Sequence, residues 1–209
     1  MPEKQDIIKH MLSTIGQSGV NTAHTMHPSV QNALAVLMGE DKEFQERGWW
    51  FNAERDITLV QNEDGEIVLP DETLKFYITN NSFYSPSRKN IFSRRNNKLY
   101  DTYRHTFAIN ESVTLSLVMR YEIDDLPPVA QTYLKHKAAE TFFLNEDGDQ
   151  SKYQRLVSKT ALAWHNVVSE QLQMAGTNAL DTPMAMNLQR GQNPGIASRN
   201  PNVIGGRSY

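Results

Sequence analysis

The sequence predicts an α+β fold in which a four-helix bundle, discontinuous along the chain, carries an inserted antiparallel β region and a flexible C-terminal arm. Three observations lead to this prediction. Apolar residues recur at helical spacing before residue 48 and after residue 123, short strand-like runs separated by turn residues lie between them, and apolar periodicity ends after residue 176. The predicted parts are therefore a helical bundle domain (1–48 and 123–176), an inserted antiparallel β domain (49–122) and an extended C-terminal tail (177–209).

Two helices are predicted before residue 48. An apolar stripe at helical spacing runs from Ile7 to Ile15 and ends at Gly16, a residue type that commonly terminates helices. Pro28 occupies the first-turn position that proline favours in the second helix, which continues to Arg47 and Gly48. Gly39 lies inside this helix at a cost of about 1 kcal/mol relative to alanine, so a break or bend is expected there.

Short apolar runs between turn residues predict the β region. Strands are expected at 49–51, 57–60 and 66–69, the last two joined as a hairpin by the turn at Asn62–Gly65. A strand is also expected at 74–79. A second hairpin pairs 91–92 with 99–100 around Arg94–Asn97, and the last strand covers 113–119. Short strands at close spacing favour an antiparallel sheet or small barrel.

Helical spacing returns after Asp124–Pro128, where an aspartate cap and first-turn prolines are expected to start the third helix. A short acidic connection ends at Asp149, which is expected to cap the fourth helix. Two helices joined by so short a loop are expected to pack as an antiparallel pair. The expected apolar face of the fourth helix is formed by Tyr153, Leu156, Val157, Ala161, Trp164, Val168, Leu172 and Ala175.

The composition excludes several kinds of chemistry. The 209 residues contain no cysteine, which removes disulfides, thiolate metal sites and cysteine nucleophiles and suits a reducing cytoplasm. No phosphate-binding glycine loop is present, and no apolar run is long enough to span a membrane. His24 and His27 are the only close histidine pair, and no carboxylate lies near enough to complete a metal site. We therefore expect no catalytic residues, no cofactor, no metal and no membrane partner.

The strongest charge feature is a basic segment between residues 88 and 104, with aromatic residues interleaved. Three interpretations remain open: a nucleic-acid-contacting hairpin, a solvated hairpin edge, or a charged interface with acidic surface on another copy. The candidate interface residues are Arg88, Lys89, Arg94, Arg95, Lys98 and Arg104.

The tail after residue 176 carries three arginines and one aspartate, so residues 1–176 hold a net charge of −5 within a total of −3. A weakly basic arm on an acidic body suggests docking onto a partner, although a disordered end would have the same composition. The candidate docking residues are Arg190, Arg199, Arg207 and Tyr209.

Three segments together resemble the tail tubular protein A family, the head-to-tail adaptors of short-tailed bacteriophages. The run Glu46–Asn52 followed by Ile57–Leu59 resembles the R-G-W-x-F-N segment of that family. Met11–Gly16 resembles the end of its first helix, and Tyr121–Phe143 resembles its third helix. The resemblance covers about residues 5–175 and includes the order of helices and β region.

The resemblance implies a structural protein of the virion tail, assembled in the host cytoplasm and without enzymatic activity. Such adaptors form a twelve-subunit ring that joins the portal protein to the tail nozzle protein and surrounds the DNA channel during ejection. DNA would pass without sequence-specific binding, and an acidic body avoids phosphate contacts that would hold it. Trp49, Trp50 and Phe51 are interpreted as a structural aromatic cluster, because large aromatic clusters usually belong to a core.

Two other functions remain as alternatives. A DNA-binding protein would use the Arg88–Arg104 hairpin, with an affinity that falls steeply with salt. A polysaccharide-acting hydrolase would need paired carboxylates, and Asp124 with Asp125 is the only obvious adjacent pair. Adjacent residues at a helix start point apart, which is a poor geometry for that chemistry.

Overall fold

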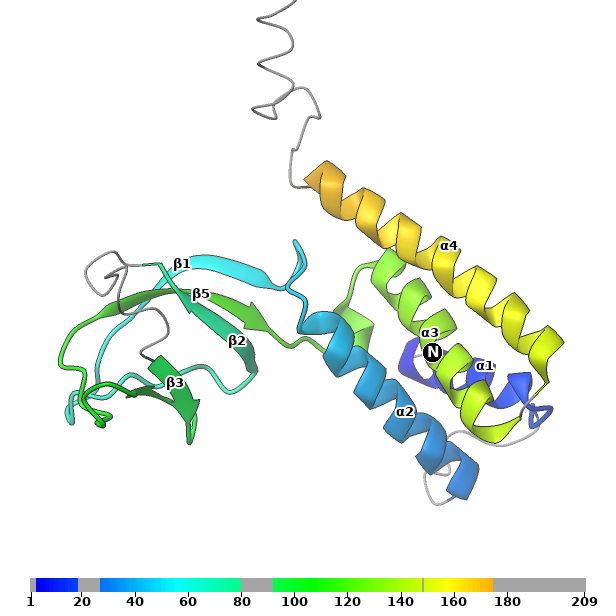
Figure 1. The fold of residues 1–209 in the computed structure, drawn as a ribbon, viewed down its shortest axis with the longest axis horizontal. Helices are drawn as coiled ribbons and strands as arrows, with labels where there is room; N and C mark the ends of the chain where they lie inside the picture. The colour runs from blue at the N-terminus through cyan, green and yellow to red at the C-terminus, as the bar shows by residue number, and fades with distance from the viewer. Residues whose placement is uncertain (1–2, 19–26, 80–91, 148, 175–209) are drawn as a thin grey trace, which may run out of the picture. The chain divides into compact units, whose positions relative to one another are not determined.

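A computed structural model describes residues 3–18, 27–79, 92–147 and 149–174. In these ranges the chain forms four α-helices and two small antiparallel sheets, which confirms the predicted α+β class (Figure 1). The chain divides into two units, Met1–Gln171 and Leu172–Tyr209, and the described part of the second is the end of helix α4 (Gln150–Met174). The predicted arm, residues 177–209, lies outside the described residues.

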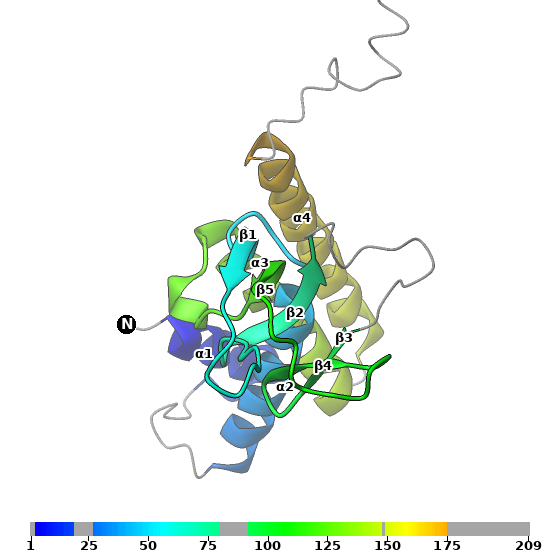
Figure 2. The ribbon, with the colours of Figure 1, turned by 90° about the vertical axis from the view of Figure 1, so that its left-hand side faces the viewer.

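Three helices, α1 (Glu3–Thr14), α2 (Pro28–Gln45) and α3 (Pro128–Glu146), share one apolar core and lie close together in Figures 1 and 2. The predicted end of the first helix is confirmed, since Gly16 has φ +82° and the Gln17 backbone N–H donates to the carbonyl of Leu12 at 2.9 Å. The fully buried side chains of this core include Ile7, Met11, Leu12, Leu37, Leu134 and Phe142.

Helix α2 runs unbroken through Gly39, so the expected interruption is wrong. Pro28 does lie in its first turn, as predicted. A Cβ atom built on Gly39 would meet no atom within 4 Å, and the residue is exposed. The surrounding helix therefore tolerates the glycine, because apolar contacts on its opposite side outweigh a propensity cost of about 1 kcal/mol.

The predicted aspartate cap of the third helix is also wrong. The N-cap of α3 is Pro127, with no side-chain cap, and a short 3-10 helix, η2 (Ile123–Asp125), precedes it. The Asp124 carboxylate instead accepts a hydrogen bond from the backbone N–H of Lys4 at 3.0 Å. It therefore satisfies a free N–H in the first turn of α1, a contact between residues far apart in the sequence.

The side that helix α4 turns to the core overlaps the predicted one in part, since Trp164 packs against the core and Tyr153, Leu156 and Val157 are half-buried. Its buried residues are Thr160, Ala163 and Val167, whereas Ala161 is exposed. The cap by Asp149 is confirmed, because its carboxylate accepts from the backbone N–H groups of Ser151 and Lys152 at 2.9 and 3.1 Å. These hydrogen bonds lower the pKa of Asp149, the one from Lys152 most.

The larger sheet has the strand order β1-β5-β2 and is antiparallel throughout. Its strands are β1 (Ala53–Leu59), β2 (Thr73–Ile78) and β5 (Val113–Met119), so the last two strand predictions are confirmed. The register of β1 shifts between Glu54 and Ile57, where Asp56 has φ +56°, which marks a bulge. A second apolar core lies on this part of the chain and contains Ile67, Leu69, Leu99, Ile109, Val113, Leu115 and Leu117.

The hairpin around Arg94–Asn97 is confirmed as β3 (Phe92–Arg95) and β4 (Lys98–Asp101). Its two-residue loop has φ +49° at Asn96 and φ +60° at Asn97. Positive φ at both positions is what a type I′ hairpin turn requires, and asparagine tolerates it better than most residues.

Two other strand predictions are wrong. Residues 49–51 form a turn before β1, closed by hydrogen bonds from the N–H groups of Asn52 and Ala53 to the Trp49 carbonyl. The turn at Asn62–Gly65 is present, but β1 pairs with β5 instead of with 66–69. Glu66 and Val68 form only isolated bridges, to Ala108 and Lys98. The long apolar strand β5 thus takes the place of the local partner.

In the part of the chain that the structure describes, every helix is too short or too polar to cross a membrane.

Candidate functional site

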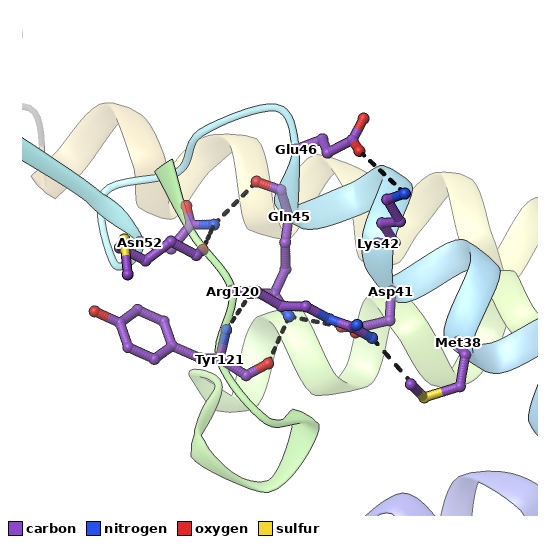
Figure 3. A network of polar contacts seen from close by, with 9 residues as sticks. Met38, Asp41, Lys42, Gln45, Glu46, Asn52, Arg120 and Tyr121 are labelled. Carbon is purple, nitrogen blue, oxygen red and sulfur yellow. Dashed lines mark hydrogen bonds and ion pairs between the residues drawn. The ribbon is translucent and has the colours of Figure 1, made fainter. Parts of the chain in front are cut away.

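A buried polar network lies where the chain passes from α2 towards β1 and returns from β5 to η2 (Figure 3). The Asp41 carboxylate is 1% exposed and accepts hydrogen bonds from Arg120 Nη2 at 3.0 Å and Gln45 Nε2 at 2.7 Å. A buried carboxylate needs such partners, because removing it from water costs several kcal/mol. The ion pair therefore joins α2 to the residue that follows β5.

The side-chain amide of Gln45 forms two hydrogen bonds with the backbone of Tyr121, as a neighbouring strand would. Its Oε1 accepts from the Tyr121 backbone N–H, and its Nε2 donates to the Tyr121 carbonyl, both at 2.8 Å (Figure 3). The side-chain amide of Asn52 bonds the backbone of three residues. Its Nδ2 donates to the carbonyls of Gln45 and Met119, both at 2.9 Å, and its Oδ1 accepts from the Trp49 N–H at 2.7 Å. Both amides are fully buried, so they hold the two connecting segments in one register.

Sequence reasoning did not single out this network, although Asn52 belongs to the quoted Glu46–Asn52 run. One signal was available. Asp41 and Gln45 continue, at four-residue spacing, the buried line that Ala33 and Leu37 begin on α2. Polar residues at core positions of an apolar stripe indicate buried hydrogen bonds, whereas their partners after β5 could not be identified from spacing.

The predicted aromatic cluster lies against the helical core. Trp49 is 6% exposed, its ring centroid lies 4.9 Å from that of Phe44 and 5.3 Å from that of Trp164, and its indole N–H donates to the Phe44 carbonyl at 2.8 Å. Trp50 and Phe51 are half-buried and pack on the same core. The backbone N–H of Trp50 donates to Gln171 of α4 at 2.8 Å. These contacts connect α2, the turn and α4.

The cations of the basic hairpin have partners within the same chain. Arg94 donates to the carbonyl oxygens of Thr73 and Asp71 and to the Asn97 side chain. Lys98 forms an ion pair with Glu66 and by this hydrogen bond lowers the pKa of the Glu66 carboxyl.

The other two described cations of the candidate interface also have intramolecular partners. The Arg95 guanidinium lies 3.8 Å from the centroid of the Tyr100 ring, and Arg104 lies 4.0 Å from the Asp101 carboxylate. The remaining candidates, Arg88 and Lys89, lie outside the described residues, as do Arg190, Arg199, Arg207 and Tyr209. The structure thus places four of the six hairpin cations and none of the tail residues.

Among the described residues, no group of three or more His, Asp or Glu side chains is placed to hold a metal ion. His27 is exposed and precedes the first residue of α2, and its sequence neighbour His24 is outside the described residues. The Asp124 carboxylate, a member of the acidic pair considered for hydrolysis, is hydrogen-bonded to the start of α1.

The polar network, the aromatic cluster and the hairpin cations all connect segments of the chain to one another. Comparison with known proteins indicates what kind of protein this is. The chain is 25% identical over 186 residues to tail tubular protein A of Klebsiella phage KP34, a match that covers 88% of this chain and 95% of that protein. It therefore falls in the class of structural proteins of the phage virion tail.

The family can be stated as well. The family model described as tail tubular protein matches residues 6–187, which include every helix and strand of the structure except the first residues of α1. The chain belongs to the tail tubular protein family.

Proposed function

We propose that this protein is the head-to-tail adaptor of a phage virion, in which twelve copies form a ring between the portal protein and the tail nozzle protein. The ring surrounds the channel through which DNA leaves during ejection, and it assembles in the host cytoplasm. The observation that carries the proposal is the match of the tail tubular protein family to residues 6–187.

The exposed surface of α4 carries Lys152, Arg155 and Lys159 along one side, and the line of residues along its other side supports an assembly of copies. At alternating three- and four-residue spacing it presents Ser151, Gln154, Ser158, Ala161, His165 and Val168, which we term the outer stripe. Five of these residues are exposed, and none of the six is Asp, Glu, Lys or Arg. Exposed helix sides are usually charged, whereas a stripe without Asp, Glu, Lys or Arg can be covered by a second helix or surface without burying such a charge.

The charge distribution supports passage of DNA over binding of DNA. The four described hairpin cations already have intramolecular partners, and residues 1–176 carry a net charge of −5. Affinity for the phosphate backbone grows with each cation that is free to contact it. An acidic protein with engaged cations is therefore suited to line a channel.

In this proposal the chain has three working parts. Residues 1–48 and 123–176 form one helical domain, arranged as a four-helix bundle, residues 49–122 form the β domain, and residues 177–209 dock onto the portal. Deleting 177–209 is expected to weaken portal binding while the far-UV circular dichroism of the remaining chain keeps its helical signal. Unchanged attachment of the truncated protein would contradict the docking role.

The ring itself is tested by measuring mass in solution, with light scattering on the full chain alone and with purified portal protein. The proposal expects a species of about 286 kDa, twelve times the 23.8 kDa of one chain, with closed rotational symmetry. The variant Ala161→Glu places a charge in the outer stripe and should prevent ring formation. Gln31→Glu places the same charge on an exposed position of α2 and is the matched control. Persistence of monomers in the presence of portal would overturn the proposal.

A further inference from the structure

Two histidine rings meet between helices distant in the sequence. His10 on α1 and His136 on α3 lie edge to face, with ring centroids 5.9 Å apart and an interplanar angle of 82°. His10 Nε2 and His136 Nδ1 are buried and have no hydrogen-bond partner in the described structure. A buried nitrogen without a partner costs about 1–3 kcal/mol, so each of these atoms gains from a further hydrogen-bonding group.

The charged side chains that shift the titration of the two rings are lysines. Lys135 on α3 and Lys159 on α4 act electrostatically on both imidazoles, and no acidic group is among the residues that do so. Burial first, and then these lysines, lower the pKa of His10 to about 4, and the pKa of His136 is lowered for the same reasons. Both rings are therefore neutral at pH 7, and each offers one N–H donor.

A metal cation does not suit this environment. Two neutral imidazoles are a common part of zinc sites, but the two lysines that act on these rings also repel a dication, and the described residues supply no third ligand. An oxyanion suits it better, because its oxygen atoms accept from imidazole N–H groups and attract both ammonium groups.

We propose that His10, Lys135, His136 and Lys159 form a binding site for an oxyanion, either a phosphate or a carboxylate group. The site lies outside the polar network and the basic hairpin, and it does not depend on the proposed ring. Because a bound anion favours the protonated imidazoles, binding strengthens as pH falls from 7 towards 5.

The test is a titration of the histidine C2 proton resonances of the full chain by NMR. It is run in chloride, in inorganic phosphate and in acetate at equal ionic strength. Phosphate or acetate at saturation is expected to raise the pKa of both histidines by about one unit or more, and the stronger of the two identifies the oxyanion. The double variant Lys135→Gln/Lys159→Gln is expected to weaken the apparent affinity for the anion at least about tenfold.

Lys152→Gln is the matched control, since Lys152 lies on α4 in an exposed ion pair with Asp147 and should leave the effect unchanged. Equal histidine titration curves in the three salts would overturn the site. An undiminished effect in the double lysine variant would also overturn it, since phosphate would then act elsewhere. Broadening of both resonances by Zn²⁺ without any response to phosphate would assign the pair to a metal.

Discussion

The ion pair between Asp41 and Arg120 offers the sharpest test of the polar network. The variant Arg120→Met keeps an unbranched apolar side chain and removes the guanidinium with its charge. The Asp41 carboxylate, 1% exposed, would then keep a single described hydrogen bond, from Gln45 at 2.7 Å. Losing one partner of a buried pair costs about 3–5 kcal/mol. The Arg120 side chain is 28% exposed, so water replaces part of the loss, and we expect about 2–4 kcal/mol.

A double-mutant cycle separates the ion pair from packing. Asp41→Asn keeps an oxygen that accepts from Gln45 and leaves Arg120 partly in contact with water, so it should cost about 1–2 kcal/mol. The double variant has no buried charge and should be more stable than Arg120→Met alone. The coupling energy expected for groups in direct contact is about 1–3 kcal/mol.

The assay is urea unfolding of the four proteins, followed by tryptophan fluorescence and by circular dichroism. Coincidence of the two signals establishes a single transition, and the free energy of unfolding follows by linear extrapolation. The reasoning would be refuted if Arg120→Met cost less than about 0.5 kcal/mol, or if the two single effects simply added.

Three other predictions follow from individual residues. Gly39→Ala should stabilise the chain by about 0.5–1 kcal/mol in the same urea assay, because its Cβ meets nothing within 4 Å, and a loss of stability would show a hidden contact. The folded-state pKa of His10 is about 4 and its unfolded value 6.5, so stability should be full above pH 6.5 and fall as the pH drops to 4. With a half-exposed ring the loss is about 1–2 kcal/mol, and His10→Gln should reduce this slope. Arg94→Ala should lower the midpoint of thermal unfolding by several degrees, since Arg94 binds the carbonyls of Thr73 and Asp71, whereas a filter-binding assay should show little change in DNA affinity.

Local signals predicted local structure well. The β3–β4 hairpin follows from two asparagines that accept positive φ, and Asp149 caps the helix that it immediately precedes. The wrong predictions concern partners that are far away in the chain. The strand 66–69 is adjacent to β1 in sequence, but the long apolar β5 pairs with β1 instead. Sequence adjacency favours a hairpin, yet burial of a whole strand decides the pairing.

The same reason limits prediction of the sites. Asp124 is a residue type that caps helices, and its carboxylate does bond the first turn of a helix. That helix is α1, whose residue Lys4 lies 120 residues earlier in the chain. His10 and His136 carry no local motif, so only the packing of α1 on α3 brings them together. The hairpin cations were found from the sequence, whereas the carbonyls and rings that engage them were not visible in it.

Two candidate interfaces of the proposed ring, the basic hairpin and the outer stripe, differ in how their stability depends on salt. An interface built on the hairpin cations would first have to break bonds such as that of Lys98 with Glu66, and it would weaken at high ionic strength. An interface built on the outer stripe gains its energy from burying uncharged surface, which salt affects little. The mass of the proposed ring, measured between about 0.1 and 1 M NaCl, therefore distinguishes the two. Dissociation with rising salt would assign the subunit interface to the basic hairpin. A mass that salt leaves unchanged, together with loss of the assembly in Ala161→Glu, would assign the interface to α4.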